Sequence, residues 1–144
     1  MRLGSQLMHI IERPIDDLVV VDACIEDYAA LFTDERLHEL SYRHFTTGEE
    51  ALQRFDAALA TLWMVNMRLP DMSGVSFLHL LRHRLRWRPV FLVGDVYSSE
   101  DEVSARAAGA SAYLCKPVNA AWLQLCRHAV SRAANRKGRP HSLP

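Results

Sequence analysis

The chain has 144 residues, of which 49% are hydrophobic and 24% charged, and its formal net charge is zero. This composition is ordinary for a soluble globular domain and gives no global sign of nucleic-acid or acidic-ligand binding. The three cysteines form no CxxC pair, which excludes a zinc ribbon or a disulfide framework of the usual spacing and fits reduced thiols in a cytoplasmic protein. No apolar run approaches the roughly 18–20 residues of a membrane span, and the N-terminal stretch lacks the apolar core of a signal peptide.

Short apolar runs alternate along the chain with longer amphipathic stretches. Strands are predicted at 17–21, 41–46, 62–65, 89–93 and 112–115. Helices are predicted at about 26–40, at 48–59, around the apolar stripe Phe77, Leu78, Leu81 and Leu85, from Ser98 or Ser99 to Gly109, and at about 119–134. This repeated β-α order predicts a parallel sheet with helices on both faces. Glu102 is placed for a capping box with Ser99.

The residues that follow the predicted strands carry the chemistry. Asp22, Ala23 and Cys24 follow the first strand, Asn66 the third, Gly94 and Asp95 the fourth, and Lys116 the fifth. Ligands of open α/β sheets bind outside the carboxyl ends of the strands. An acid, an amide and a lysine are therefore expected to meet in one cleft. A purely structural interpretation is that Asp22 and Lys116 pair there to neutralise each other, which does not exclude a function.

Four segments at matching spacings carry a family resemblance: "LVVVDA", "VNMRLPDMSG", "RPVFLVGD" and "AGASAYLCKPV". Over roughly residues 16–135 the chain resembles the receiver domains of two-component response regulators, and its "RLPDMSG" loop is most similar to receivers that precede helix-turn-helix output domains. The resemblance implies a flavodoxin-like (βα)5 fold, a three-layer sandwich around a five-stranded parallel sheet. Residues 1–15 are then an N-terminal extension, and residues 136–144 are expected to be a disordered polar tail.

In that family an aspartate accepts a phosphoryl group from a histidine kinase. Two acidic residues help to bind Mg²⁺, a hydroxyl and a lysine contact the phosphoryl oxygens, and an aromatic side chain reports the change to the surface. The resemblance places four residues of this chain at matching positions: Asp22 at the first acidic position, Lys116 at the lysine, Pro117 at the cis-type proline and Tyr113 at the switch aromatic.

Three positions depart from the family pattern. Asn66 stands at the phosphoacceptor position, Ala23 at the second acidic position and Gly94 at the hydroxyl position. A neutral amide is a poor nucleophile, and the loss of a carboxylate weakens any site for a hard cation. No cofactor is expected beyond weak Mg²⁺ binding through Asp22. Asp95 or Glu26 could restore negative charge, although neither stands at a family ligand position.

These losses together predict a degenerate receiver that is not an enzyme. We expect it to signal by protein–protein contact without aspartyl phosphorylation, with a histidine kinase, another response regulator or an output domain as partner, or as a homodimer. The Asn66 amide is expected to donate to Asp22 and to accept from Lys116. One alternative is a working receiver with Asp95 or Asp71 as acceptor. Another is a small α/β enzyme, which lacks a glycine-rich phosphate loop and any visible Ser/His or Cys/His pairing.

The remaining features have structural interpretations. The arginines of segment 82–89 and the basic residues of the tail are interpreted as solvated helix ends, with nucleic-acid binding not expected. Cys24 and Cys115 are expected to be buried structural thiols. His79 and His83 lie one turn apart on a helix but lack a third metal ligand in the sequence. Trp122 is expected to anchor the core, and its exposure would instead indicate a partner contact.

Overall fold

The computed structural model describes residues 16–35, 41–56, 60–84 and 88–138. Within these residues one parallel sheet has the strand order β2-β1-β3-β4-β5. Its strands are β1 (Asp16–Val21), β2 (Tyr42–Phe45), β3 (Ala60–Asn66), β4 (Val90–Gly94) and β5 (Ala112–Cys115). The predicted five-stranded parallel sheet is confirmed, and each strand overlaps the segment for which it was predicted.

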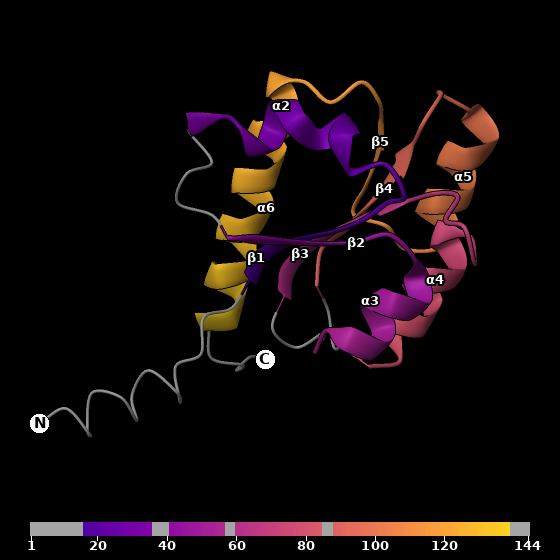
Figure 1. Ribbon diagram of the computed structural model, residues 1–144. Helices are drawn as coiled ribbons and strands as arrows, with labels where there is room; N and C mark the ends of the chain where they lie inside the picture. Colours follow the sequence, from indigo (N-terminus) through magenta and orange to yellow (C-terminus); the bar gives the residue numbers. More distant parts are fainter. Residues whose placement is uncertain (1–15, 36–40, 57–59, 85–87, 139–144) are drawn as a thin grey trace, which may run out of the picture.

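Helices cover both faces of the sheet (Figure 1). The 3₁₀ helix η1 (Ile25–Tyr28) and the helices α2 (Ala29–Phe32) and α6 (Ala120–Gly138) pack on one face. The helices α3 (Gly48–Arg54), α4 (Gly74–Arg82) and α5 (Ser99–Ala107) pack on the other. The molecule is therefore the expected three-layer sandwich.

The central strand β3 shows why both faces carry a core. Trp63 and Val65 point into the core under α3, α4 and α5, whereas Leu62 and Met64 point into the core under η1, α2 and α6. Side chains alternate between faces along a strand, and all four are fully buried. An unbroken apolar run is what a strand covered on both sides requires.

Three predicted helices differ in detail from the observed ones. The first begins as a 3₁₀ turn because the Cys24 N–H donates to the Asp22 carboxylate (2.9 Å) and turns the chain immediately after β1. Its α-helical part ends at Phe32, and residues 36–40 lie outside the described part. Helix α3 ends at Arg54, and the predicted residues 57–59 also lie outside it.

The last helix continues to Gly138, beyond the expected end near 134. The first three residues of the expected disordered tail, 136–138, are thus helical, and 139–144 lie outside the described residues, as do the expected extension 1–15 and Leu85. No helix in the described ranges has the length and apolar character needed to span a membrane.

The ends of α5 were predicted only in part. Ser98 caps the helix, with its Oγ accepting the N–H of Asp101 (3.2 Å), so the expected capping box from Ser99 to Glu102 is wrong by one residue. Gly109 follows the helix with φ +94°, the left-handed conformation that favours glycine, as predicted.

Candidate functional site

The sheet order brings the ends of β1, β3, β4 and β5 to one edge, where the predicted cleft residues meet. The Asn66 Nδ2 atom donates to Asp22 Oδ2 and to Asp95 Oδ1, both at 3.0 Å. The Lys116 Nζ atom lies 3.0 Å from Asp22 Oδ2. The predicted convergence of an acid, an amide and a lysine is therefore confirmed, and Asp95 joins it.

Asn66 is almost completely buried, with 2% of its surface exposed. Its two amide hydrogens serve two carboxylates, so the expected donation to Asp22 is confirmed. Its Oδ1 atom accepts the backbone N–H of Arg68 at 2.7 Å. The expected acceptance from Lys116 is wrong, because that ammonium group is bonded to carboxylate oxygens instead.

Three carboxylates surround the Lys116 ammonium group. Its Nζ atom lies 3.0 Å from Asp22 Oδ2, 2.7 Å from Asp27 Oδ2 and 2.9 Å from Asp95 Oδ1. An ammonium has three N–H donors, one for each carboxylate. Burial alone would lower the pKa of Lys116, but its hydrogen bonds to the three aspartates outweigh burial and raise the pKa above its ordinary value. The lysine therefore stays charged.

The cleft-facing oxygen of Asp22 is crowded by donors. Oδ2 accepts the Tyr28 hydroxyl (2.7 Å), the Asn66 amide and the Lys116 ammonium, and Oδ1 accepts the Cys24 N–H. Tyr28 is fully buried, and burial followed by the charge of Asp22 raises the pKa of its phenol far above the ordinary value. The Tyr28 ring also lies under the lysine, with Nζ 5.4 Å from the ring centroid.

Asp95 stands at the open side of the cleft, with 61% of its side chain exposed. Its burial would raise its pKa, but the hydrogen bonds from Lys116 and Asn66 outweigh that effect and lower the pKa. An open hollow of about 360 Å³ is lined there by Asp27, Asp95, Lys116 and Pro117. The Lys116–Pro117 peptide bond is cis, as the resemblance implied.

Gly94 lies directly beneath the Tyr113 side chain. A Cβ atom at Gly94 would come within 2.5 Å of the Tyr113 hydroxyl oxygen and 3.2 Å of the ring carbon that carries it. That hydroxyl accepts the backbone N–H of Ser98 at 3.3 Å, and the ring of Tyr97 packs edge-on against that of Tyr113. The tyrosine thus occupies the space that a side chain at position 94 would need.

The loop after Asn66 is fastened at both ends. The guanidinium of Arg68 makes two hydrogen bonds to the Asp101 carboxylate of α5, at 2.7 and 3.2 Å. The carboxylate of Asp71 accepts the N–H groups of Gly48 (3.0 Å) and Glu49 (2.8 Å) at the start of α3. Asp71 therefore lies against α3 rather than in the cleft with Lys116.

Sequence reasoning missed three contributors to this edge. Asp27 and Tyr28 belong to η1, and the 3₁₀ turn directs both side chains back onto the Asp22–Lys116 pair. Arg68 supplies both a backbone donor to Asn66 and a side-chain pair to Asp101. An aspartate directly after a strand favours an Asx turn, and this was the sequence signal that could have predicted the early chain reversal and hence the positions of Asp27 and Tyr28. Within the described residues, Asp27 rather than Glu26 brings additional negative charge to Lys116.

Three described arginines, Arg82, Arg84 and Arg88, bind backbone carbonyl groups. Arg82 donates to the carbonyl of Arg88 (2.9 Å), Arg84 to that of Leu52 (2.6 Å), and Arg88 to that of Ala60 (3.1 Å). Burial lowers the pKa of Arg82. These contacts hold the three arginines to the backbone at the edge of the sheet opposite the cleft. Arg84 is exposed as expected of a solvated helix end, whereas Arg82 and Arg88 are half-buried.

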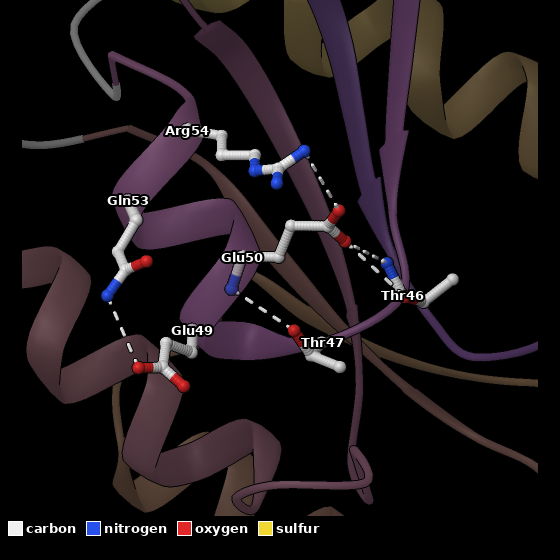
Figure 2. Close-up of a pocket in the computed structure, with 6 residues that line it drawn as sticks. All are labelled: Thr46, Thr47, Glu49, Glu50, Gln53 and Arg54. Carbon is white, nitrogen blue, oxygen red and sulfur yellow. Dashed lines mark hydrogen bonds and ion pairs between the residues drawn. The ribbon is translucent and has the colours of Figure 1, made fainter.

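A second hollow lies beside the start of α3, and its polar lining is satisfied internally (Figure 2). Thr47 caps the helix through the N–H of Glu50 (3.1 Å), and the Glu50 carboxylate accepts the N–H of Thr46 (3.2 Å). Arg54 pairs with the same carboxylate at 3.8 Å. These contacts form a helix cap, and they give no sign of a ligand.

The cysteines differ from the expectation. Cys24 is exposed and Cys115 half-buried, whereas Cys126 is buried and burial raises the pKa of its thiol to about 12. Trp122 is 4% exposed and packs edge-on against Tyr28, so its predicted role in the core is confirmed. Across the described ranges, no group of three His, Cys, Asp or Glu side chains is arranged to hold a metal ion.

The solved structures similar to this one define the class of fold. A response regulator receiver domain protein (CheY-like) from Methanospirillum hungatei JF-1 superposes with a TM-score of 0.70 and 23% identity, covering 85% of this chain and 98% of its own. The signal receiver domain of a putative LuxO repressor protein from Vibrio parahaemolyticus gives a TM-score of 0.70 and 24% identity, covering 85% and 95%. The fold is therefore the flavodoxin-like, CheY-like one.

The sequence comparisons identify the family. The model of the response regulator receiver domain matches residues 15–126, and the chain therefore belongs to that family of two-component signalling domains. The cell cycle response regulator CtrA of Brucella ovis and of Brucella abortus (strain 2308) is 29% identical over 123 residues, which cover 83% of this chain. The chain spans about half the length of these relatives, 52% in the alignment.

Proposed function

We propose that this receiver domain signals by protein–protein contact without aspartyl phosphorylation. The single observation that carries the proposal is the bonding of Asn66: at the position that the resemblance assigns to the phosphoacceptor, both hydrogens of a buried amide are already bonded to carboxylates. The nitrogen lone pair of an amide is delocalised into its carbonyl group and the amide oxygen is a poor nucleophile, so Asn66 is a poor acceptor for a phosphodonor.

Two further departures support the proposal. Ala23 contributes no carboxylate at the second acidic position, so Asp22 is the one family acid left after β1. Gly94 offers no hydroxyl for a phosphoryl oxygen, and the Tyr113 hydroxyl fills the space above it. We therefore propose no catalytic activity and no cofactor beyond weak Mg²⁺.

The partner class follows from the family. We infer a cytoplasmic module of about residues 16–135 that contacts a histidine kinase, another response regulator, an output domain or a second copy of itself. Because the chain covers only about half of the cell cycle regulators it resembles, an attached output domain is one of these proposed partners. Nucleic-acid binding is not proposed, because the described arginines Arg82, Arg84 and Arg88 bind backbone carbonyls.

Phosphoryl labelling tests the proposal. The chain is incubated with acetyl phosphate and Mg²⁺ and analysed by intact mass spectrometry and hydroxylamine treatment, and no hydroxylamine-labile phosphoryl adduct is expected. Asn66→Asp alone is expected to label poorly, because Ala23 and Gly94 remain. Efficient labelling of the unchanged chain would overturn the proposal, and efficient labelling of Asn66→Asp would show that the other two losses matter little.

The alternative acceptor with structural support is Asp95. It is exposed, and one of its oxygens contacts both Lys116 and Asn66, so its carboxylate shares the lysine of the cleft. Asp71 has less support, because both of its oxygens bind the start of α3. Peptide mapping after treatment with a histidine kinase separates these cases: a phosphoryl group on Asp95 would replace the main proposal.

A further inference from the structure

The family implies a Mg²⁺ ion among the acids of this edge, and the structure allows the fit of that ion to be tested. Mg²⁺ needs oxygen ligands at about 2.0–2.1 Å in near-octahedral geometry. The Oδ2 atom of Asp22 already accepts donors from Tyr28, Asn66 and Lys116. Ala23 has no ligand atom, and the Asn66 Oδ1 atom binds the Arg68 N–H. The side chains present do not fit the ion.

The Lys116 ammonium takes the place that a cation would have between the acids. Each of its contacts, to Asp22, Asp27 and Asp95, is between 2.7 and 3.0 Å. Only 9% of the lysine side chain and 4% of the Asp22 side chain are exposed, so solvent screens this contact weakly, whereas Asp27 and Asp95 are about half exposed and their contacts are screened more. Two of the three acids, Asp27 of η1 and Asp95 after β4, are bound to the lysine in addition to Asp22.

Tyr28 blocks access of a metal ion to Asp22 from the buried side of the cleft. Its hydroxyl donates to the same Asp22 oxygen that the lysine contacts, at 2.7 Å, and its ring lies beneath the ammonium. A metal ion approaching Asp22 Oδ2 would have to displace this phenol or the lysine. The phenol stays protonated at ordinary pH, so it offers the ion no negative ligand in return.

We propose that Lys116 is the resident cation of this site and that, together with Tyr28, it excludes divalent metal ions from the cleft. The inference deepens the proposed function, on which it rests, because a cleft with its own internal cation needs no metal to hold its acids together. It also explains why three aspartates can face one another at an edge that has lost Mg²⁺-binding positions. Removal of the lysine should then create a metal dependence that the natural chain lacks.

The test uses the whole chain, with Mn²⁺ as a spectroscopic probe and Mg²⁺ or Ca²⁺ as stabilising ions. For the unchanged chain, electron paramagnetic resonance should show no saturable Mn²⁺ binding tighter than about 1 mM, the weak end of protein calcium sites. Its melting temperature should respond to MgCl₂ no more than to NaCl at equal ionic strength. In EDTA, the melting temperature of Lys116→Met should be lower than that of the unchanged chain. Addition of Mg²⁺ or Ca²⁺ should raise it again, and the increase should saturate with ion concentration.

Two further variants serve as matched controls. Lys116→Arg keeps the positive charge and should stay insensitive to metal, whereas Tyr28→Phe removes one donor from Asp22 and should bind Mn²⁺ more tightly than the unchanged chain does. Saturable sub-millimolar binding of Mn²⁺ by the unchanged chain would overturn the inference. So would a melting temperature of Lys116→Met that responds to Mg²⁺ or Ca²⁺ no more than that of the natural chain does. If Lys116→Met does not fold in EDTA, refolding in Ca²⁺ supports the inference. If it refolds in neither, a Tyr28→Phe variant without tighter binding overturns it.

The metal titration needs no phosphodonor, so its outcome is separate from phosphoryl labelling. A chain that binds Mn²⁺ but takes no label would contradict this inference and leave the proposed function intact. A chain that is phosphoryl-labelled but binds no metal would contradict the proposed function and leave the exclusion of metal ions intact.

Discussion

The hydroxyl oxygen of Tyr113 lies 2.5 Å from the position that a Cβ atom of residue 94 would occupy. The position of the Tyr113 side chain therefore requires that residue 94 has no side chain. Tyr113 in turn accepts the N–H of Ser98, the residue that caps α5. The size of residue 94 thus bears on the loop that leads into α5.

Gly94→Thr should force Tyr113 outward or strain the strand end. The expected loss of stability is about 1–3 kcal/mol, the usual effect of extra groups in a packed site. Urea unfolding of Gly94→Thr, of Tyr113→Ala and of the double variant forms a double-mutant cycle. The cost of the threonine should largely disappear in the Tyr113→Ala background, because the clashing hydroxyl and ring are gone. Equal costs in both backgrounds would show that the two residues are independent.

Asn66→Asp should destabilise the domain at neutral pH. The change removes two amide donors and places a third carboxylate beside Asp22 and Asp95, with an expected loss of about 1–3 kcal/mol. Like charges raise the folded-state pKa of the new carboxyl above its unfolded value of about 4. The part of the penalty that comes from charge is therefore absent below the unfolded pKa, grows between the unfolded and the folded pKa, and is complete above the folded pKa, whereas the loss of the donors remains at every pH.

Asn66→Ala provides the comparison for that experiment. It removes the same donors without adding a charge, so its loss of stability should depend less on pH than that of Asn66→Asp. Urea unfolding of both variants from pH 4 to pH 8 measures the difference. Parallel pH profiles would contradict the role assigned to charge.

Asp71 should stabilise the contact between its loop and α3. Burial would raise its pKa, but the hydrogen bonds from Glu49 and Gly48 outweigh this effect and lower the pKa. Asp71→Ala should cost about 1 kcal/mol at pH 7, as the loss of a helix N-terminal acceptor does. Because the folded pKa is depressed, this contribution is present above the unfolded pKa and is lost as the pH falls through the folded pKa.

The corresponding measurement is the difference in unfolding free energy between Asp71→Ala and the natural chain at two pH values. The difference should be largest near pH 7 and smaller near pH 3, close to the ordinary carboxyl range. Asp71→Asn keeps one acceptor, and its free energy of unfolding at pH 7 should lie between those of Asp71→Ala and the natural chain. A difference that does not change with pH would exclude the charged hydrogen bonds as its source.

Trp122→Ala should be among the most destabilising single changes in the domain. Its indole is 4% exposed and contacts Tyr28, whose hydroxyl binds Asp22. Removal of a buried tryptophan costs about 3–5 kcal/mol. Leu125 on the same helix is 40% exposed, and Leu125→Ala is therefore the matched control with a much smaller expected loss. Thermal unfolding of both variants makes the comparison.

Local pattern predicted the strands and the residues at their ends, because each property needs only short stretches of sequence. β5 was predicted residue for residue, and Lys116 and Asn66 lie in the cleft as expected. The partners of these groups were harder to predict. The hydrogen bond from the Asn66 Nδ2 atom to Asp22 was predicted correctly. The partner of the Asn66 Oδ1 atom was predicted wrongly, because this oxygen accepts the backbone N–H of Arg68.

Asp27 and Tyr28 were missed for a different reason. A regular helix after β1 was expected, and in such a helix the side chains turn by about 100° per residue. The Asx turn at Asp22 starts a 3₁₀ segment instead, and that segment places two consecutive side chains on the same lysine. Their positions depend on one side-chain-to-backbone hydrogen bond, which no periodicity reveals.

The two hydrogens of the Asn66 amide bind two different aspartates, and this feature bears on how the domain can change over time. Asn66→Asp alone would add a fourth acid to the three that already surround Lys116, and is expected to lose stability before it gains any activity. Residues 23 and 94 would have to change as well, and Tyr113 would have to move to admit a side chain at 94. On the proposed function, phosphotransfer would therefore require several substitutions, of which Asn66→Asp alone is expected to be destabilising.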